Sequence, residues 1–441
     1  MPVVRPFRAL RFEPEAVGDL AAVVSPPYDV IGPDEHRHLL ERHPRNVVRL
    51  DFPHGEPGDE PDDRYRRAAR TLAAWRSDGT LRKDPRPALY VYEQTYRVPG
   101  TAVERQQRGF FGRLRLEAFG PGSGVLPHER TFEAAREDRY RLLRATGVNT
   151  SPVVALFADA AGAAASALAS IAATPAEIDI ADDDGVRHRL WIVPDDGEPD
   201  GPVATLAGLA GEQPVTIADG HHRYETALRY RDERRMGRSC EEDPAFDYLL
   251  TLLLPTGGTP LTVLPTHRLV CGLGEPGVAE LWRRLPELFD VETGADAASL
   301  EHRFEAAALA DGGRGRFGCW TRGRGAFLVA RREAFRASLP SGGEALRHLD
   351  VTLLAVALER LCGIDPASLD AGSRIAYAKS AAEAIRLVDA GDGGTDAVFL
   401  LEPTPVASIV AVAADGDVMP QKSTYFYPKA LTGLVINPHE W

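Results

Sequence analysis

The sequence predicts an α/β protein with mixed sheets, divided into two parts. Several short runs alternate apolar with polar residues and are rich in aromatic or branched side chains, which is typical of half-buried strands. Helical patterns lie between these runs. The chain has 441 residues, of which 44% are hydrophobic. That length is enough for about two to three domains, each able to bury its own core.

The first part of the chain opens with an apolar run, residues 21–24, which we interpret as a strand that leads into a shaped loop. Pro26 and Pro27 end any helix there and favour an extended or turn conformation. Further along, a charged helix is expected to run to about Leu143. Its polar residues predict a solvated face; they are Arg136, Asp138, Arg139 and Arg144. The other expected elements are helices at 62–78 and 221–236 and strands at 88–98, 107–116, 153–157, 187–193, 215–218 and 247–254.

The pattern changes beyond about Gly272, where helices and strands alternate. We therefore divide the chain into residues 1–272, which carry the motifs described below, and an α/β domain of residues 273–441. The elements expected in this second part are helices at 278–288, 350–361 and 380–389 and strands at 316–320, 325–330 and 397–401. Residues 418–441 form a closing run.

Charge and composition exclude several classes of function. The formal net charge of −13 and a pI near 5.5 disfavour nucleic-acid binding, which normally needs clustered Lys and Arg. The N-terminal residues lack the pattern of a signal peptide, and no stretch has the length and apolar character of a membrane span. The four cysteines are widely spaced, which fits a reducing compartment. We expect a cytoplasmic protein without a membrane partner.

The densest functional signal lies at residues 217–224, Ile-Ala-Asp-Gly-His-His-Arg-Tyr. A short strand delivers Asp219 and Gly220 to a turn, and a helix opens at His221. Free N–H groups and the positive end of the helix dipole favour an anion such as phosphate. His222 and Arg223 add donors at the same end, whereas Asp219 can cap the helix or hold a metal ion or a hydroxyl. An ordinary helix cap with exposed histidines is the alternative.

A second group of polar residues follows a flexible Gly-rich loop. His128, Glu129 and Arg130 combine an imidazole, a carboxylate and a guanidinium, which suits binding of a substrate carboxylate and proton transfer. A structural pair of Glu129 and Arg130 at a helix start would account for the same residues.

Two further segments have both a structural and a functional interpretation. Tyr28 and Asp29 follow the two prolines, and Asp29 could lie beside the phosphate site or bond its own backbone as an Asx turn. In the C-terminal segment, Lys422, Ser423 and Thr424 could supply a phosphate-binding lobe, or Lys422 could protect an exposed strand edge.

Together these motifs resemble a bacterial and archaeal family, the domain-of-unknown-function family numbered 1015. The strings are Pro-Pro-Tyr-Asp-Val at 26–30, Leu-Pro-His-Glu-Arg-Thr at 126–131, Ile-Ala-Asp-Gly-His-His-Arg-Tyr at 217–224 and Lys-Ser-Thr-Tyr-Phe-Tyr-Pro-Lys at 422–429. They span nearly the whole chain. The family name assigns no reaction.

The Asp-Gly-His-His-Arg string is also similar to the phosphate-binding motif of the ParB/sulfiredoxin-like fold, in particular that of free serine kinases. This resemblance implies a ParB/sulfiredoxin-like core in the first part. It also implies that His221, His222 and Arg223 contact nucleotide phosphates and that Asp219 lies at the transfer site. Such kinases use a separate glutamate as base, for which Glu129 and Glu93 are the candidates.

The leading hypothesis is a phosphotransferase that uses ATP or ADP with Mg²⁺ to phosphorylate a small hydroxylated metabolite, most plausibly free L-serine. Phosphoryl transfer requires positioning and charge neutralisation, which fits the helix end at Gly220. Asp219 would bind the metal or orient the acceptor hydroxyl. One alternative is a phosphoserine phosphatase at the same site, and another is a nucleotide-sensing, ParB-like regulator without catalysis. The second part could also serve only to form a homodimer or to support the first.

Overall fold

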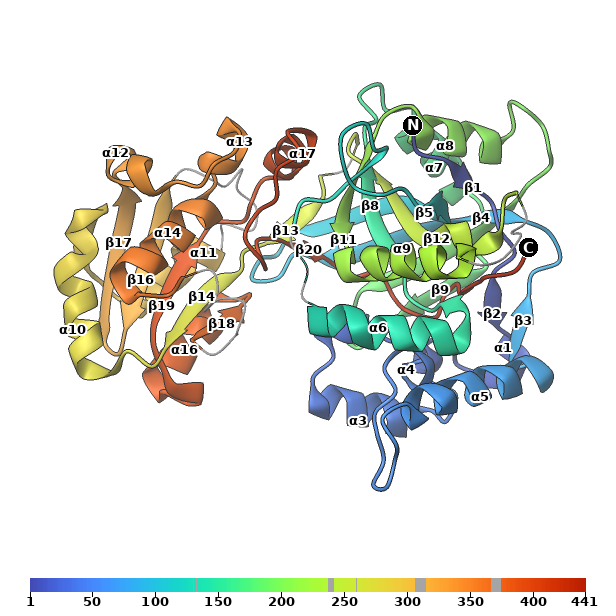
Figure 1. Cartoon of the computed structure of the whole chain (residues 1–441), viewed down its shortest axis with the longest axis horizontal. Coiled ribbons are helices and arrows are strands. Elements are labelled where there is room, and N and C mark those ends of the chain that lie inside the picture. The colour runs from blue at the N-terminus through green and yellow to red at the C-terminus, as the bar shows by residue number, and fades with distance from the viewer. Residues whose placement is uncertain (130, 132, 237–241, 259, 306–314, 366–373) are drawn as a thin grey trace.

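The computed structural model describes residues 1–129, 131, 133–236, 242–258, 260–305, 315–365 and 374–441. Figure 1 shows two bodies side by side, each built around one β-sheet with helices against it. The smaller body runs from β14 (His267–Cys271) to α17 (Val406–Ala414), and the larger body contains the N-terminal residues and the end of the chain. The predicted class, α/β with mixed sheets, is confirmed.

The sheet of the larger body has the strand order β6-β11-β8-β12-β5-β4-β10-β9, with β1 paired to β5. Strand β11 is parallel to β6 and β12 is parallel to β8, whereas β4, β5 and β10 are antiparallel to their neighbours. Successive residues of β4 alternate between two cores, Tyr90 in one and Val91 in the other. The strands are β1 (Val4–Arg5), β4 (Ala88–Arg97), β5 (Glu104–Arg115), β6 (Val125–Leu126), β8 (Val153–Phe157), β9 (Ile178–Ala181), β10 (Arg187–Pro194), β11 (Val215–Asp219) and β12 (Tyr248–Pro255).

Helices cover this sheet, and α9 packs against α6, which in turn packs against α5. The helices are α1 (Pro14–Val17), α2 (Leu20–Val23), α3 (Pro33–Arg42), α4 (Val48–Asp51), α5 (Asp63–Ser77), α6 (Glu133–Thr146), α7 (Ala163–Ala172), α8 (Pro202–Gly211) and α9 (His221–Arg235). A small separate ladder joins β2 (Leu10–Phe12) to β3 (Leu81–Lys83).

The sheet of the smaller body has the order β15-β17-β16-β19-β14-β18, with antiparallel neighbours throughout. Its other strands are β15 (Phe289–Ala295), β16 (Arg316–Thr321), β17 (Arg324–Ala330), β18 (Ile375–Ala378) and β19 (Thr395–Leu401). Its helices include α10 (Gly274–Arg284), α11 (Ala297–Glu305), α12 (Arg332–Phe335), α13 (Glu344–Arg347), α14 (Asp350–Cys362) and α16 (Ala381–Ala390). Helix α14 is buried along most of its length.

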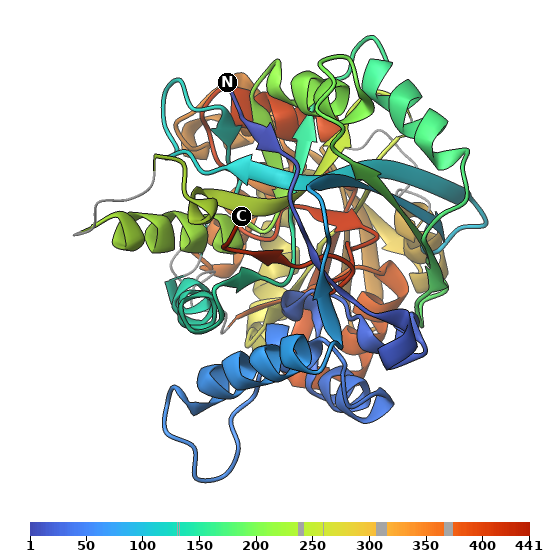
Figure 2. The same cartoon turned by 90° about the vertical axis from the view of Figure 1, so that its right-hand side faces the viewer.

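After α17 the chain returns to the larger body. Strand β20 (Tyr425–Tyr427) pairs with β13 (Thr262–Leu264), and β21 (Asn437–Pro438) pairs with β7 (Val148–Asn149). In Figure 2 the dark red end of the chain lies among the blue and cyan N-terminal strands. The division at residue 272 stays a prediction. Two elements lie on the other side of it from the rest of their body: β14 precedes residue 272 but belongs to the smaller sheet, and the last residues follow it but pair within the larger body.

Most of the expected long elements are found, among them β8, α5 and α9. The prediction of a strand at 21–24 is wrong, because residues 20–23 form the short helix α2. Asp19 caps this helix by accepting the N–H of Ala21 at 2.9 Å. A short apolar run does not distinguish a strand from a buried helical turn.

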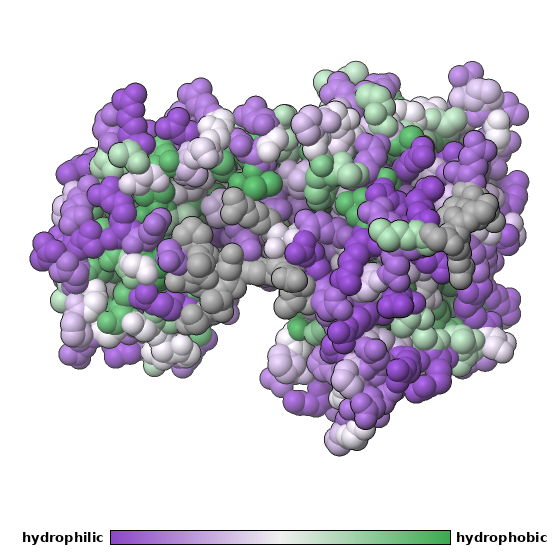
Figure 3. Space-filling model, viewed as in Figure 1, coloured by the Kyte–Doolittle hydropathy of each residue, from purple (hydrophilic) through white to green (hydrophobic). Residues whose placement is uncertain are grey.

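The face of the molecule seen in Figure 3 is mainly hydrophilic, with apolar residues in small separate patches. Among the described residues, no helix is both long and apolar enough to cross a membrane.

Candidate functional site

The turn between β11 and α9 brings together the strand end and the helix start that the motif predicted. The register of β11 against β8 shifts between Ile217 and Asp219, a bulge that changes the direction of the side chains that follow. Gly220 has a φ of 91°, in the region that favours glycine. The first helical hydrogen bond runs from the N–H of Tyr224 to the carbonyl of Gly220 at 3.0 Å. The N–H groups of the first turn therefore point out of the helix end.

Asp219 is held between two cations. Its Oδ1 accepts from Nζ of Lys429 at 2.6 Å and its Oδ2 accepts from Nη2 of Arg223 at 2.6 Å. Burial alone would raise the pKa of this carboxyl group, but the charges of Lys429 and Arg223 hold it well below its usual range. Asp219 is therefore ionised at neutral pH and fixes the two cations in place.

Arg223 turns back over the helix start. Its Nη1 donates to the carbonyl of Pro152 and its Nη2 to Asp219. A Cβ atom on Gly220 would lie 3.0 to 3.2 Å from the guanidinium group of Arg223. The glycine thus permits both the turn and the close approach of Arg223.

Two neutral histidines connect the loop after β6 to this turn. Nδ1 of His128 lies 2.5 Å from the carbonyl oxygen of Ile217, which only accepts, so Nδ1 carries the hydrogen. Nε2 of His128 then accepts from the hydroxyl of Thr424 at 3.0 Å. Nε2 of His221 accepts the N–H of His128 at 3.2 Å. Burial lowers the pKa of His128 to about 4 and that of His221 well below its ordinary value.

Glu129 lies beside the same turn, next to the C-terminal segment. Its Oε1 accepts the N–H of Lys422 at 2.9 Å, and its backbone forms a bridge with Met419. Removal from water raises the pKa of Glu129 to about 7, and the charge of Asp219 adds to this effect. A carboxyl group with this pKa can exchange a proton at neutral pH.

Lysines from two distant segments meet around the ring of Tyr425. Nζ of Lys379 lies 3.8 Å from the ring centroid and Nζ of Lys429 lies 4.4 Å from it. Burial, followed by the charge of Lys429, lowers the pKa of Lys379 to about 8. Lys379 follows β18 in the smaller body, so both bodies contribute to the site. Sequence reasoning missed Lys379 and Lys429 as site residues. Lys429 ends a quoted motif, whereas no motif marks Lys379.

The segment after the two prolines also lies near the site. Tyr28 begins a 3-10 turn, and the guanidinium carbon of Arg139 lies 3.9 Å from the centre of its ring. Arg139 is buried and donates to the carbonyl of Asp51, which corrects the prediction that it belongs to a solvated face. Asp29 is exposed, and its charge acts on His222 and Lys379.

The other predicted residues are placed as follows. The Ser423 hydroxyl donates to the carbonyl of Pro420, and the Thr424 hydroxyl is bound to His128. Glu93 lies on β4, four strands away from β11 and thus roughly 19 Å from it at the usual strand spacing. Its carboxylate is bound by Arg108 and Arg189. The structure does not bring Glu93 to the turn, and Arg130 lies outside the described residues.

The fold and this cluster define a mixed α/β protein with a buried charged site at a strand-turn-helix junction. Residues 4–352 match the family described as "Protein of unknown function (DUF1015)", and the chain belongs to this family. The resemblance drawn from the four motifs is confirmed, although residues 422–429 lie beyond the matched range.

Comparisons with solved structures give distant similarities. A free serine kinase in complex with AMP is 14% identical, with a TM-score of 0.35 over 70% of this chain and 89% of that chain. A conserved hypothetical protein from Pyrococcus furiosus is 13% identical, with a TM-score of 0.34 over 70% and 92%. SbnI with a C-terminal truncation, from Staphylococcus aureus, is 11% identical, with a TM-score of 0.33 over 70% and 84%. No curated protein matches the chain significantly.

Proposed function

We propose that the protein is a phosphotransferase that moves a phosphoryl group from ATP or ADP to a small hydroxylated metabolite, with free L-serine as the first candidate acceptor. The observation that carries this proposal is the cluster at the α9 start: Arg223 and Lys429 are bound to Asp219, and Lys379 lies over Tyr425, beside Glu129, a carboxyl group with a pKa of about 7. Phosphoryl transfer needs this combination of charge neutralisation and positioned proton acceptor.

The cations bind and orient the phosphates. The first-turn N–H groups of α9, beginning at Gly220 and including those of His221, His222 and Arg223, face the anion, and Lys379 and Lys429 neutralise its charge. Arg223 orients Asp219, because its Nη2 binds that carboxylate while its Nη1 is fixed by the carbonyl of Pro152. Lys422 positions Glu129, and Ser423 and Thr424 support the same segment through Pro420 and His128.

Glu129 accepts the proton of the acceptor hydroxyl. The hydroxyl oxygen forms a bond to the terminal phosphorus, the bond between that phosphorus and the nucleotide breaks, and the nucleotide leaves with one phosphate fewer. His128 stays neutral and fixes the loop that carries Glu129. Tyr28 and Asp29 line the approach to the site for the acceptor.

The residues present do not fit a magnesium ion on Asp219. Both oxygens of its carboxylate are already bound by Nζ of Lys429 and Nη2 of Arg223. Among the described residues, no group of three or more His, Cys, Asp or Glu side chains is arranged to hold a metal ion. Magnesium usually reaches such sites with the nucleotide phosphates, and we assign no step through Asp219-bound metal.

The test is incubation of the protein with Mg²⁺, L-serine and ATP or ADP in turn, with products followed by mass spectrometry. A parallel mixture contains phosphoserine alone. Phosphoserine formed by the wild type and lost in Glu129→Gln supports the proposal, while Glu333→Gln, an exposed glutamate in the smaller body, serves as the matched control. Release of phosphate from phosphoserine without nucleotide would instead indicate the phosphatase, and bound nucleotide without any product would indicate the sensor.

A further inference from the structure

The smaller body contains a cavity of about 570 Å³ that the proposed reaction does not use. This volume is within the range of about 300–1,000 Å³ typical of small-molecule sites. Its walls come from α14, strands β14 and β18, α13 with the segment before it, and the segment after α17. The wall includes Arg268, Tyr377, Thr352, Ala355, Val356 and Met419.

Arg268 is a buried cation in the wall of this cavity, with a relative exposure of 5%. Its Nη1 donates to the carbonyl and the hydroxyl of Thr266, and its Nη2 donates to the carbonyl of Lys422 at 3.1 Å. Among the described residues, no carboxylate oxygen lies within 4.0 Å of its guanidinium nitrogens. The charge of Glu129 acts on Arg268 only from beyond ion-pair distance. A buried charge without an opposite charge in contact with it is costly.

The donors that remain on Arg268 define the shape of the missing anion. The contacts above occupy Nη1 and one hydrogen of Nη2, so Nε and the second hydrogen of Nη2 form an edge with two parallel N–H groups. This edge matches the two oxygens of a planar carboxylate. The face of the guanidinium lies over the ring of Tyr377, 4.7 Å from its centre, which fixes the plane of the fork.

The rest of the cavity wall indicates the body of the ligand. Val351, Val356 and Met419 are buried apolar residues, and the hydroxyl of Thr352 is buried without a hydrogen-bond partner among the described residues. The two acidic wall residues disfavour a doubly charged anion, since Glu359 is exposed at the rim and Asp417 binds the N–H of Gly343 at 2.6 Å.

We propose that this cavity binds a small organic monocarboxylate with an apolar body, whose carboxylate pairs with Arg268. The single charge of the ligand balances the single buried cation, and the apolar walls bury the remainder of the molecule. The proposal does not depend on phosphoryl transfer, although the cavity adjoins the segment of Glu129: Lys422 contacts both Arg268 and Glu129, and the charges of these two residues act on each other.

The experiment is isothermal titration calorimetry of the full chain, without nucleotide, using octanoate as the probe. Acetate carries the same charge without the body, and 1-octanol carries the same body without the charge. We expect octanoate to bind at least tenfold more tightly than either control compound. Equal affinity for octanoate and 1-octanol would overturn the role of Arg268, and absence of octanoate binding would overturn the site.

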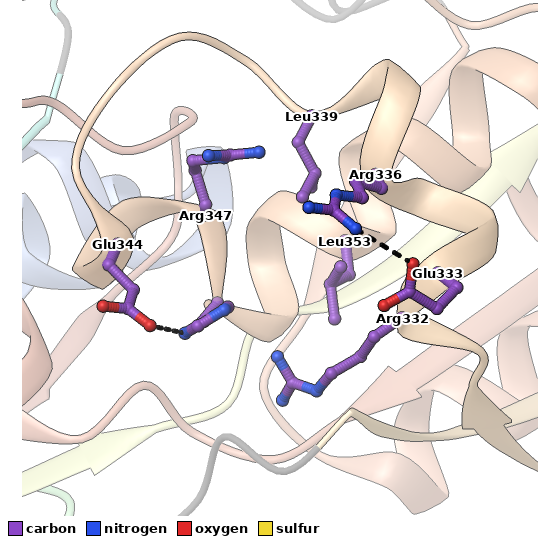
Figure 4. A pocket seen from close by; sticks show the side chains of 8 residues that line it. Arg332, Glu333, Arg336, Leu339, Glu344, Arg347 and Leu353 are labelled. Atoms are coloured by element: carbon purple, nitrogen blue, oxygen red, sulfur yellow. Dashed lines mark hydrogen bonds and ion pairs between the residues drawn. The ribbon is translucent and has the colours of Figure 1, made fainter.

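Variants test the position of the ligand. Arg268→Met should weaken octanoate binding at least tenfold. Ala355→Phe fills the cavity without removing a contact of Arg268 and should also abolish binding, which keeps the test valid if Arg268→Met folds poorly. Arg332→Met alters an exposed arginine in the neighbouring hollow shown in Figure 4 and should leave octanoate binding unchanged. Unchanged binding in Ala355→Phe would place the probe elsewhere and overturn the proposal.

Discussion

Two regions contain arginine, histidine and carboxylate side chains in different surroundings. One is the turn at Asp219, and the other is the outer hollow of the smaller body, the pocket of Figure 4 that is lined by residues of α12 and α13. At the turn, Arg223 and Asp219 are 2.6 Å apart with side-chain exposures of 8% and 15%. In the hollow, Arg336 and Glu333 are 3.5 Å apart with exposures of 76% and 87% (Figure 4). His348 and Glu344 form a similarly open pair at 3.7 Å.

This comparison shows that burial, and not the residue types, gives charged groups their effect. Water screens the pairs of the hollow, so each pair contributes little to stability. At the turn, burial shifts the pKa of Glu129 upward and that of His128 downward. The following predictions test this difference, beginning with the largest expected effect.

Glu129→Gln should lower the rate of phosphoryl transfer by about 10²–10⁴-fold, the usual contribution of a general base. In the wild type the rate should rise with pH and level off above about 7, because Glu129 must be ionised to accept a proton. Stopped assays between pH 5.5 and 8.5 measure this profile. A variant that keeps the wild-type rate would remove Glu129 from the mechanism.

Lys429→Met should destabilise the fold by about 3–5 kcal/mol, because it leaves the buried carboxylate of Asp219 without one partner. Urea unfolding at pH 7 gives this value, and Asp219→Asn combined with Lys429→Met should recover part of it. The lowered pKa of Asp219 means that its contribution is present above about pH 4 and is lost as the pH falls toward the folded-state pKa. Equal stability of Lys429→Met and wild type would contradict the ion pair.

Gly220→Ala should cost about 1–2 kcal/mol of stability for the positive φ. It should also weaken nucleotide binding, because the new Cβ displaces Arg223. Gly197→Ala is the matched control: Gly197 has a φ of 76°, and a Cβ atom added there would meet no other atom within 4 Å, so only the backbone strain is shared. If the two variants bind nucleotide equally well, the contact between Gly220 and Arg223 has no functional role.

Lys379→Met should weaken nucleotide binding about threefold to tenfold, or roughly 0.6–1.4 kcal/mol. In the wild type the affinity should fall as the pH rises through about 8, where Lys379 loses its charge. Calorimetry at pH 7 and pH 9 tests this dependence. Lys379→Arg should retain its affinity at pH 9, and a wild type with constant affinity over this range would exclude Lys379 from phosphate binding.

Arg336→Met, in the outer hollow, should change neither the unfolding free energy nor nucleotide binding within the error of either measurement. Its partner Glu333 is almost fully exposed. A clear loss of stability would mean that exposed pairs of this protein matter as much as buried ones, and the comparison would fail.

Sequence patterns predicted the elements and part of the site. Strong periodicity located β8 and α9, and the Asp-Gly-His-His-Arg string located the turn. The pattern could not show that Arg139 is covered by Tyr28, because a helical face becomes buried only when other segments pack on it. Lys379 was missed for a related reason, since it reaches Tyr425 only after the two bodies come together. The sequence did not distinguish Glu129 from Glu93 as the candidate base. The strand order does, because it places Glu93 four strands away from β11.

The ion pair between Lys429 and Asp219 joins residues 210 positions apart, which has a consequence for biosynthesis. At about 5–20 residues per second, roughly 10–40 s pass between the synthesis of Asp219 and that of Lys429. Throughout this interval the nascent strand β11 carries a carboxylate that lacks one of its partners, and Glu129 lacks the N–H of Lys422. The site is therefore incomplete until the last segment has been synthesised and has docked. Shortening that segment would remove the proposed activity while leaving most of the sheets intact.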